Sequence, residues 1–237
     1  KFTFDQGGGT GLDRLDDKMP TAWEETTGTG VDSGIVNVTG VGAQTDIEWA
    51  LSSDFLPEGL SAYLAYSPKA DGAKSNDKAT SGATNSSNQA GWDAVVEYSG
   101  GAEGLNIFAG KSSIKKSDTD THAASVVGFT YAVGGFTLGY QWSEEDTGRA
   151  TTNTKYTNDA YGITFSINDD LSIGYNNYKS DRSSTTDVEL EASSVQIAYS
   201  VGGLSIRLAD GSIDNQNYTT GADNQRDATT LSVALAF

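Results

Sequence analysis

The sequence predicts an all-β fold, a transmembrane antiparallel β-barrel with twelve strands in this chain. Short stretches of strict apolar–polar alternation recur along the chain, whereas helical spacing of apolar residues does not. Long and short connections alternate, and no apolar run approaches the roughly 18 to 20 residues that a helical span requires. The chain has 237 residues, 28 glycines and no cysteine, which excludes a disulfide framework and Cys-bound zinc. We expect a single domain, residues 1–237.

The charge balance restricts the possible partners. The chain carries 32 acidic and 15 basic side chains, for a formal net charge of -17. Binding to nucleic acid needs clustered Lys and Arg, so no nucleic-acid partner is expected. The mean hydropathy of -0.41 resembles that of a soluble protein, but alternation conceals the apolar face of a barrel from such an average.

The strands are recognised by bulky apolar residues on alternate positions. The end of the chain shows this best, because the other positions of 230–236 hold only Thr, Ser and Ala. In chain order, the apolar positions of the twelve strands are Phe2 and Phe4; Ile47, Trp49 and Leu51; Leu60, Leu64 and Tyr66; Trp92, Val96 and Tyr98; Leu105 and Ile107; Val127, Phe129, Tyr131 and Val133; Phe136, Leu138, Tyr140 and Trp142; Tyr161, Ile163, Phe165 and Ile167; Leu171, Ile173 and Tyr175; Val195, Ile197, Tyr199 and Val201; Leu204, Ile206 and Leu208; and Leu231, Val233, Leu235 and Phe237.

The connections predict which ends of the strands lie together. Short turns are expected at 53–59, 100–104, 134–135, 168–170 and 202–203. Long polar connections are expected at 7–44, 67–90, 112–122, 143–158, 179–192 and 210–227. A soluble sandwich has no reason to place every long loop at one end, whereas an outer-membrane barrel does so. Aromatic residues near both ends of the strands are typical of rings at two membrane interfaces.

Two segments resemble the general diffusion porins of Gram-negative bacteria, most closely the alphaproteobacterial, Rhodobacter-like type. The segment ending in Leu231, Val233, Leu235 and Phe237 is similar to the outer-membrane assembly signal. The opening Lys1-Phe2-Thr3-Phe4-Asp5-Gln6 and the 38 residues after it resemble the fifth porin strand and the third external loop. The resemblance implies that this chain is the C-terminal part of a sixteen-stranded barrel. A complete twelve-stranded outer-membrane channel is the alternative.

The resemblance also implies a function and partners. It implies an outer-membrane homotrimer in contact with lipid and lipopolysaccharide, which forms a water-filled channel for passive diffusion of small hydrophilic solutes and ions. Loop 7–44 would fold inward as the constriction. Its charged candidates are Asp13, Arg14, Asp16, Asp17, Lys18, Glu24 and Glu25.

The strand phases predict further pore-lining residues. Side chains at the positions that alternate with the apolar residues in each strand should face the lumen. The charged residues at these positions are Lys1, Asp46, Glu48, Asp93, Glu97 and Arg207. Carboxylates outnumber basic groups, so weak cation preference is expected. No cofactor is expected. The acidic pairs Asp118 with Asp120, Asp181 with Asp187 and Asp210 with Asp214 lie in predicted external loops and leave Ca²⁺ or Mg²⁺ binding open.

Two other classes of protein remain as alternatives. A lipid-modifying enzyme of the outer membrane would need a catalytic histidine on the outer wall, and His122 is the only histidine. The strand phase places His122 on the polar side or in a loop, so no enzymatic activity is expected. A soluble, secreted β-rich adhesin would also fit the acidity, but no fixed repeat is visible.

Overall fold

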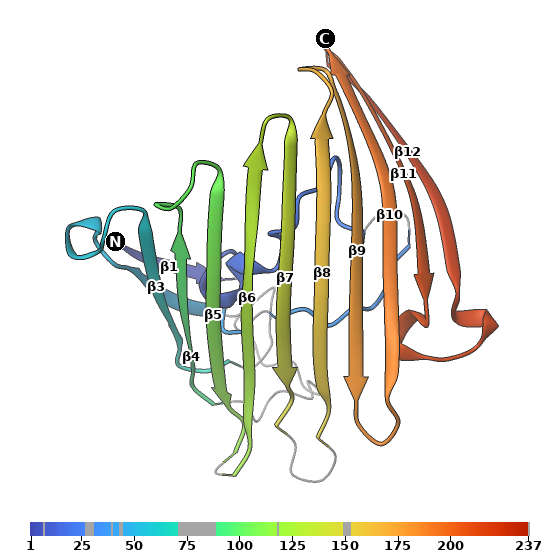
Figure 1. Ribbon diagram of the computed structural model, residues 1–237. Coiled ribbons are helices and arrows are strands. Elements are labelled where there is room, and N and C mark those ends of the chain that lie inside the picture. Colours follow the sequence, from blue (N-terminus) through green and yellow to red (C-terminus); the bar gives the residue numbers. More distant parts are fainter. Residues whose placement is uncertain are drawn as a thin grey trace. The chain divides into compact units, whose positions relative to one another are not determined.

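Twelve strands follow one another in sequence order in one sheet, which confirms the all-β antiparallel prediction. The computed structural model describes residues 1–6, 8–26, 31–38, 40–42, 45–70, 89–117, 119–148 and 153–236 (Figure 1). The strands are β1 (Phe2–Gln6), β2 (Thr45–Ala50), β3 (Leu60–Ser67), β4 (Gly91–Tyr98), β5 (Leu105–Lys115), β6 (Thr121–Val133), β7 (Phe136–Asp146), β8 (Lys155–Ser166), β9 (Leu171–Ser183), β10 (Val188–Val201), β11 (Leu204–Asp214) and β12 (Arg226–Leu235).

The residues group into two compact units. Unit 1 contains 1–17, 37–128 and 143–156, and unit 2 contains 18–36, 129–142 and 157–237. In unit 1, β3 pairs antiparallel with β4, with Tyr66 opposite Trp92. In unit 2, β10 pairs antiparallel with β9 and β11, so that Tyr199 lies opposite Leu171 and Ile206. The orange strands β9 and β10 run side by side in Figure 1.

The two faces of the strands differ in the expected way. Phe2 and Phe4 are each 73% exposed, whereas Asp46 between the apolar positions of the paired strand β2 is fully buried. The same alternation occurs in unit 2, where Val195 is 56% exposed and its neighbour Gln196 is fully buried. The large apolar side chains therefore form an exposed face, and the polar side chains lie on the covered face, called the polar face below. An exposed apolar face of this extent is typical of contact with lipid or protein.

Several connections are shorter than the sequence predicts. The predicted loop 179–192 is reduced to 184–187, because β9 continues to Ser183 and β10 begins at Val188. The predicted loop 112–122 is reduced to 116–120. In these extensions the apolar residues lie on the covered face, as with the buried Ile114 of β5 and the buried Val188 and Leu190 of β10. The pattern of exposed apolar residues therefore ends before the hydrogen bonding does. Asp181, Asp210 and Asp214 therefore lie in strands β9 and β11, which corrects their assignment to loops.

The segment between β1 and β2 carries the 3-10 helix η1 (Gly11–Leu15). Leu12 and Leu15 of η1 are fully buried. Gly110 of β5 leaves room for them, because a Cβ at this position would collide with the methyl groups of both leucines. The other 3-10 helices are η2 (Ser53–Phe55), η3 (Gln216–Tyr218) and η4 (Ala222–Asn224). Within the described ranges, no helix is both long enough and apolar enough to cross a membrane.

Candidate functional site

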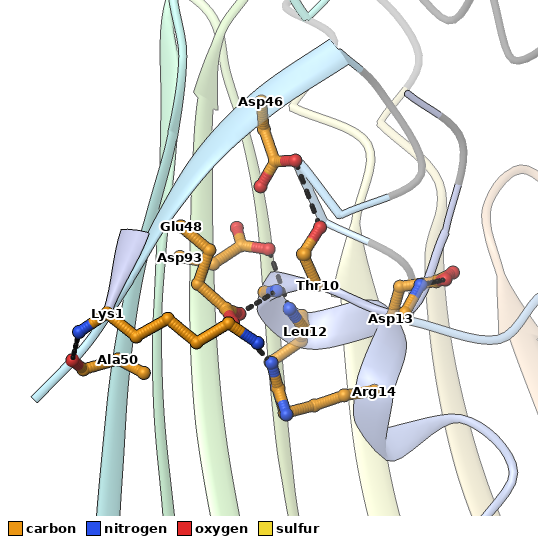
Figure 2. Close-up of polar contacts among 11 residues, drawn as sticks. Lys1, Thr10, Leu12, Asp13, Arg14, Asp46, Glu48, Ala50 and Asp93 are labelled. Carbon is orange, nitrogen blue, oxygen red and sulfur yellow. Dashed lines mark hydrogen bonds and ion pairs between the residues drawn. The ribbon is translucent and has the colours of Figure 1, made fainter. Parts of the chain in front are cut away.

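The first part of the segment between β1 and β2 is held by three carboxylates in unit 1 (Figure 2). Thr10 Oγ1 donates to Asp46 Oδ1 at 3.0 Å, and the amide of the next residue, Gly11, donates to Glu48 Oε2 at 2.8 Å. The amide of Leu12 then donates to Asp93 Oδ2 at 2.8 Å. These three hydrogen bonds fix the start of η1 against β2 and β4.

Asp93 also holds the returning end of the segment. The amide of Val41 donates to the same oxygen, Asp93 Oδ2, at 2.9 Å. Residues 12 and 41, which are far apart along the segment, are thus tied to one side chain that is 1% exposed. Asp93 acts as a clamp for both ends of the part of the segment that belongs to unit 1.

Arg14 is paired within the same cluster. Its Nη2 lies 2.5 Å from Glu48 Oε1, and its guanidinium carbon lies 3.8 Å from the ring centroid of Tyr63. Glu48 therefore uses one oxygen for Arg14 and the other for the backbone of Gly11. The positive charge of Arg14 is neutralised locally, which reduces its attraction for anions.

The remaining carboxylates at η1 lie close together. Asp13 Oδ2 accepts from the amide of Gly9 at 2.8 Å, and Asp17 is exposed. Asp16 lies in this connecting segment, outside the strands. Burial, and then the nearby Asp13 and Asp17 carboxylates, raise the pKa of Asp16 from 3.8 to about 7. Its negative charge is therefore sensitive to pH near neutrality.

The second part of the segment is held in unit 2 by the fully buried Gln196 of β10. Gln196 Oε1 accepts from the amides of Trp23 and Glu24 at 2.9 and 3.3 Å. Gln196 Nε2 donates to the carbonyl of Glu24 at 2.5 Å and to Ser194 Oγ at 2.8 Å. One neutral amide side chain thereby satisfies three backbone groups of the segment.

Other polar side chains of unit 2 extend this attachment. The contacts are Asn176 Nδ2 to the carbonyl of Pro20 at 2.6 Å, Tyr178 Oη to Glu25 Oε1 at 2.8 Å, Thr26 Oγ1 with Ser194 Oγ at 2.9 Å, and Asn158 Nδ2 to the carbonyl of Val36 at 2.9 Å. Gly174 of β9 gives the chain room to approach, because a Cβ there would lie 3.0 Å from the amide nitrogen of Ala22. Strands β8, β9 and β10 thus bind the segment through side chains of their polar face.

The other predicted site residues differ in the exposure of their side chains. Lys1 is exposed and its α-amino group donates to the carbonyl of Ala50 at 3.0 Å. Glu97 and Lys18 are half-buried, whereas Arg207 and Glu24 have exposed side chains. In β12, Leu231, Val233 and Leu235 are exposed on the apolar face. Phe237 and Asp118 lie outside the described residues.

Sequence reasoning missed the residues that attach the segment, namely Thr10, Tyr178, Asn158, Asn176, Ser194 and Gln196. The strand residues among these share one signal, since they occupy the polar phase of a strand without being charged. A long neutral side chain on that phase is suited to hydrogen-bond a passing backbone. This signal would have identified Asn158, Asn176 and Gln196.

The sole histidine and the acidic groups were the candidates for other chemistry. His122 of β6 lies on the polar phase, and its Nε2 is 3.0 Å from Glu145 Oε1 of β7. In the described part of the chain, no group of three or more His, Asp or Glu side chains is arranged to hold a metal ion.

Comparisons with known proteins agree with this architecture. OmpT, an outer membrane protein of Vibrio cholerae, superposes with a TM-score of 0.66 at 12% identity, covering 98% of this chain and 75% of that chain. A trimer form of OmpT gives a TM-score of 0.64 at 10% identity, covering 98% and 76%. A porin refined at 1.8 Å resolution gives 0.65 at 15% identity, covering 100% and 77%. The anion-selective porin from Comamonas acidovorans gives 0.61 at 13% identity, covering 84% and 62%.

At these identities the superpositions show the fold alone. A search of curated protein sequences finds no match. The sequence profile of the Gram-negative porin family matches residues 12–217, which is most of the chain. The covered polar face and the exposed apolar face are those of an outer-membrane channel protein, and the chain belongs to the Gram-negative porin family.

Proposed function

We propose that the chain forms a water-filled channel for the passive diffusion of small hydrophilic solutes and ions, and that the segment between β1 and β2 is its constriction. The observation that carries this proposal is the attachment of the segment. Side chains of the polar face hold it at Thr10, Leu12 and Val41 in unit 1 and at Pro20, Trp23 and Glu24 in unit 2. A connection fixed along the polar face narrows the path that solutes take.

The same segment supports a weak preference for cations. Residues 7–44 contain six carboxylates and two basic side chains. One of the two basic groups, Arg14, is neutralised by Glu48. Acidic walls raise the local concentration of cations. The anion-selective Comamonas porin has a similar fold, so ion preference has to come from the residues of each chain.

A reversal-potential measurement tests this proposal. The purified chain is inserted into a planar bilayer that separates two KCl solutions of different concentration. We expect the sign of the reversal potential to show that K⁺ permeates more readily than Cl⁻. The permeability ratio of K⁺ to Cl⁻ should be only a few, on the order of what a surface potential near kT produces. The triple variant Asp13→Asn, Asp16→Asn, Asp17→Asn should lower the ratio. Asp169→Asn, in the exposed turn between β8 and β9, is the matched control. Anion preference of the unmodified chain would contradict the proposal.

The pKa of Asp16 predicts a pH dependence of the same quantity. Below pH 7 the carboxyl is mostly neutral, and above pH 7 it is mostly charged, because its pKa is raised to about 7. The preference for K⁺ should therefore increase between pH 6 and pH 8. Burial favours the neutral carboxyl, so Asp16 stabilises the folded position of the segment at low pH. This stabilisation is lost as the pH rises through about 7.

The matched variant separates Asp16 from the other titrating groups. Asp16→Asn should remove the increase in K⁺ preference between pH 6 and pH 8 and leave the preference close to its value at pH 6. Reversal potentials recorded at several pH values in one bilayer measure this effect. An unchanged pH profile in Asp16→Asn would exclude Asp16 as its source.

We further propose transport without bond chemistry. The family and the fold point to a channel, and the sole histidine is paired with Glu145. The exposed apolar face is proposed to contact outer-membrane lipid, with lipopolysaccharide beside the long loops. A homotrimer is proposed because a protein of similar fold is known in a trimer form. Assignment to the alphaproteobacterial type stays a prediction.

A sixteen-stranded barrel is the proposed complete architecture. The strand order of the described residues begins at β1 and ends at β12, and in lipid the outer edges of these two strands need hydrogen-bonding partners. Twelve strands are three quarters of sixteen, and this chain covers 77% of a porin of similar fold. Four further strands would accordingly complete the ring.

A further inference from the structure

The connection between β11 and β12 has an unusual backbone. Asn215, Asn217 and Tyr218 have φ values of 55°, 56° and 54°, and they are the non-glycine residues with positive φ among those the structure describes. Asparagine tolerates this left-handed conformation, but it is unfavourable for a bulky residue such as tyrosine. Strain of this kind persists only where surrounding contacts enforce the conformation.

The contacts that enforce it are made by the side chain of Tyr218, which is 5% exposed. Its Oη accepts from the amide of Val36 at 3.0 Å and lies 2.6 Å from Ser180 Oγ on the polar face of β9. The guanidinium carbon of Arg182 lies 5.5 Å from the ring centroid, within reach of a cation–π interaction. A loop side chain is thus inserted between a strand of unit 2 and the end of the segment 18–36.

Two neighbours of Tyr218 hold the same segment. The amide of Asn217 donates to the carbonyl of Ser33 at 3.0 Å, and Gln216 Nε2 donates to the carbonyl of Asp32 at 2.5 Å. Gly34 is needed for this approach, because a Cβ there would collide with the side chain of Asn217. Three consecutive residues, 216–218, therefore contact residues 32–36 through backbone and side-chain hydrogen bonds.

We propose that the connection between β11 and β12 is a second element of the constriction, with Tyr218 as the residue that positions the end of the segment 18–36. This inference rests on the proposed channel function. The two connections then narrow the pore as one body, so the size limit for solutes depends on a loop about 180 residues away in sequence. Tyr218 acts on solutes through the position of the segment, because its side chain is buried.

Channel measurements on the full chain test the role of Tyr218. Tyr218→Ala should raise the single-channel conductance by about 1.5-fold or more and admit larger sugars in liposome swelling, because pore width controls which solutes pass. Tyr218→Phe keeps the ring and loses the hydroxyl, and should give a smaller increase. Tyr199→Phe, on the apolar face of β10, is the control and should match the unmodified chain. Conductance and sugar limit unchanged in Tyr218→Ala would overturn the inference.

A cross-link tests the contact without relying on conduction. The chain has no cysteine, so Ser33→Cys combined with Asn217→Cys introduces one possible disulfide. The bond of 3.0 Å from the amide of Asn217 to the carbonyl of Ser33 holds the two backbones next to each other, as a disulfide requires. We expect rapid oxidation of the folded double variant, with each single variant as control, and failure to oxidise would overturn the inference even if Tyr218→Ala does not fold. If the double variant forms the disulfide but the unmodified chain conducts no ions, the contact is real and the channel function is refuted instead.

Discussion

Replacing Asp93 with alanine should release both ends of the unit 1 part of the proposed constriction. The amides of Leu12 and Val41 lose their shared acceptor. A hydrogen bond contributes about 0.5 to 3 kcal/mol, with the larger values for charged acceptors, so the loss of two bonds should weaken the docking of this part by about 1 to 6 kcal/mol. We expect a lower midpoint of thermal unfolding in detergent and larger fluctuations of the open-channel current.

The control for Asp93→Ala is Glu103→Ala, which removes a carboxylate from the exposed turn between β4 and β5. Asp93→Asn provides a second comparison, because it keeps one acceptor oxygen without the charge and should fall between the alanine variant and the unmodified chain. Current fluctuations in Asp93→Ala equal to those of Glu103→Ala would show that the segment is held by other contacts.

Replacing Gln196 with leucine should have the next largest effect, and it acts on unit 2. The change removes the acceptor for the amides of Trp23 and Glu24 and the donor to the carbonyl of Glu24. Neutral hydrogen bonds contribute about 0.5 to 1.5 kcal/mol each, so the loss should be about 2 to 4 kcal/mol. Leucine is similar in size and cannot satisfy any of these three groups.

Limited proteolysis in the region of Trp23 and Glu24 measures this effect directly. The folded Gln196→Leu variant should be cleaved there faster than the unmodified chain, while Gln225→Leu, at an exposed position of the connection between β11 and β12, should not. Equal cleavage rates in Gln196→Leu and in the unmodified chain would contradict an anchoring role for Gln196.

The sequence predicts the two faces of a strand where neighbouring residues alternate between apolar and polar. Phe2 and Phe4 against Asp46, or Val195 against Gln196, can be assigned to faces by their alternation alone. The strand ends could not be predicted in this way. Beyond the apolar band both faces of β9 are polar, and Lys179 to Ser183 resemble a loop although they are paired with β10 through Arg182.

The side chains that hold the segment between β1 and β2 were harder to predict than the position of the segment in the sequence. The segment between β1 and β2 could be recognised by its length, and its charges could be counted. Which side chains hold it depends on distances between residues such as Trp23 and Gln196, more than 170 positions apart. Alternation predicts that Gln196 lies on the polar face, but not which backbone groups it meets there.

In the proposed channel, pore width and ion preference depend on different residues. The buried carboxylates of Asp46, Glu48 and Asp93 accept hydrogen bonds from backbone amides, a hydroxyl and Arg14, and these bonds fix the position of the segment. In the proposed channel, the carboxylates that would act on passing ions belong to the segment itself, as with Asp16 and the exposed Asp17. Pore width and ion preference should therefore be adjustable one at a time, by changing the strand residues or the loop residues respectively.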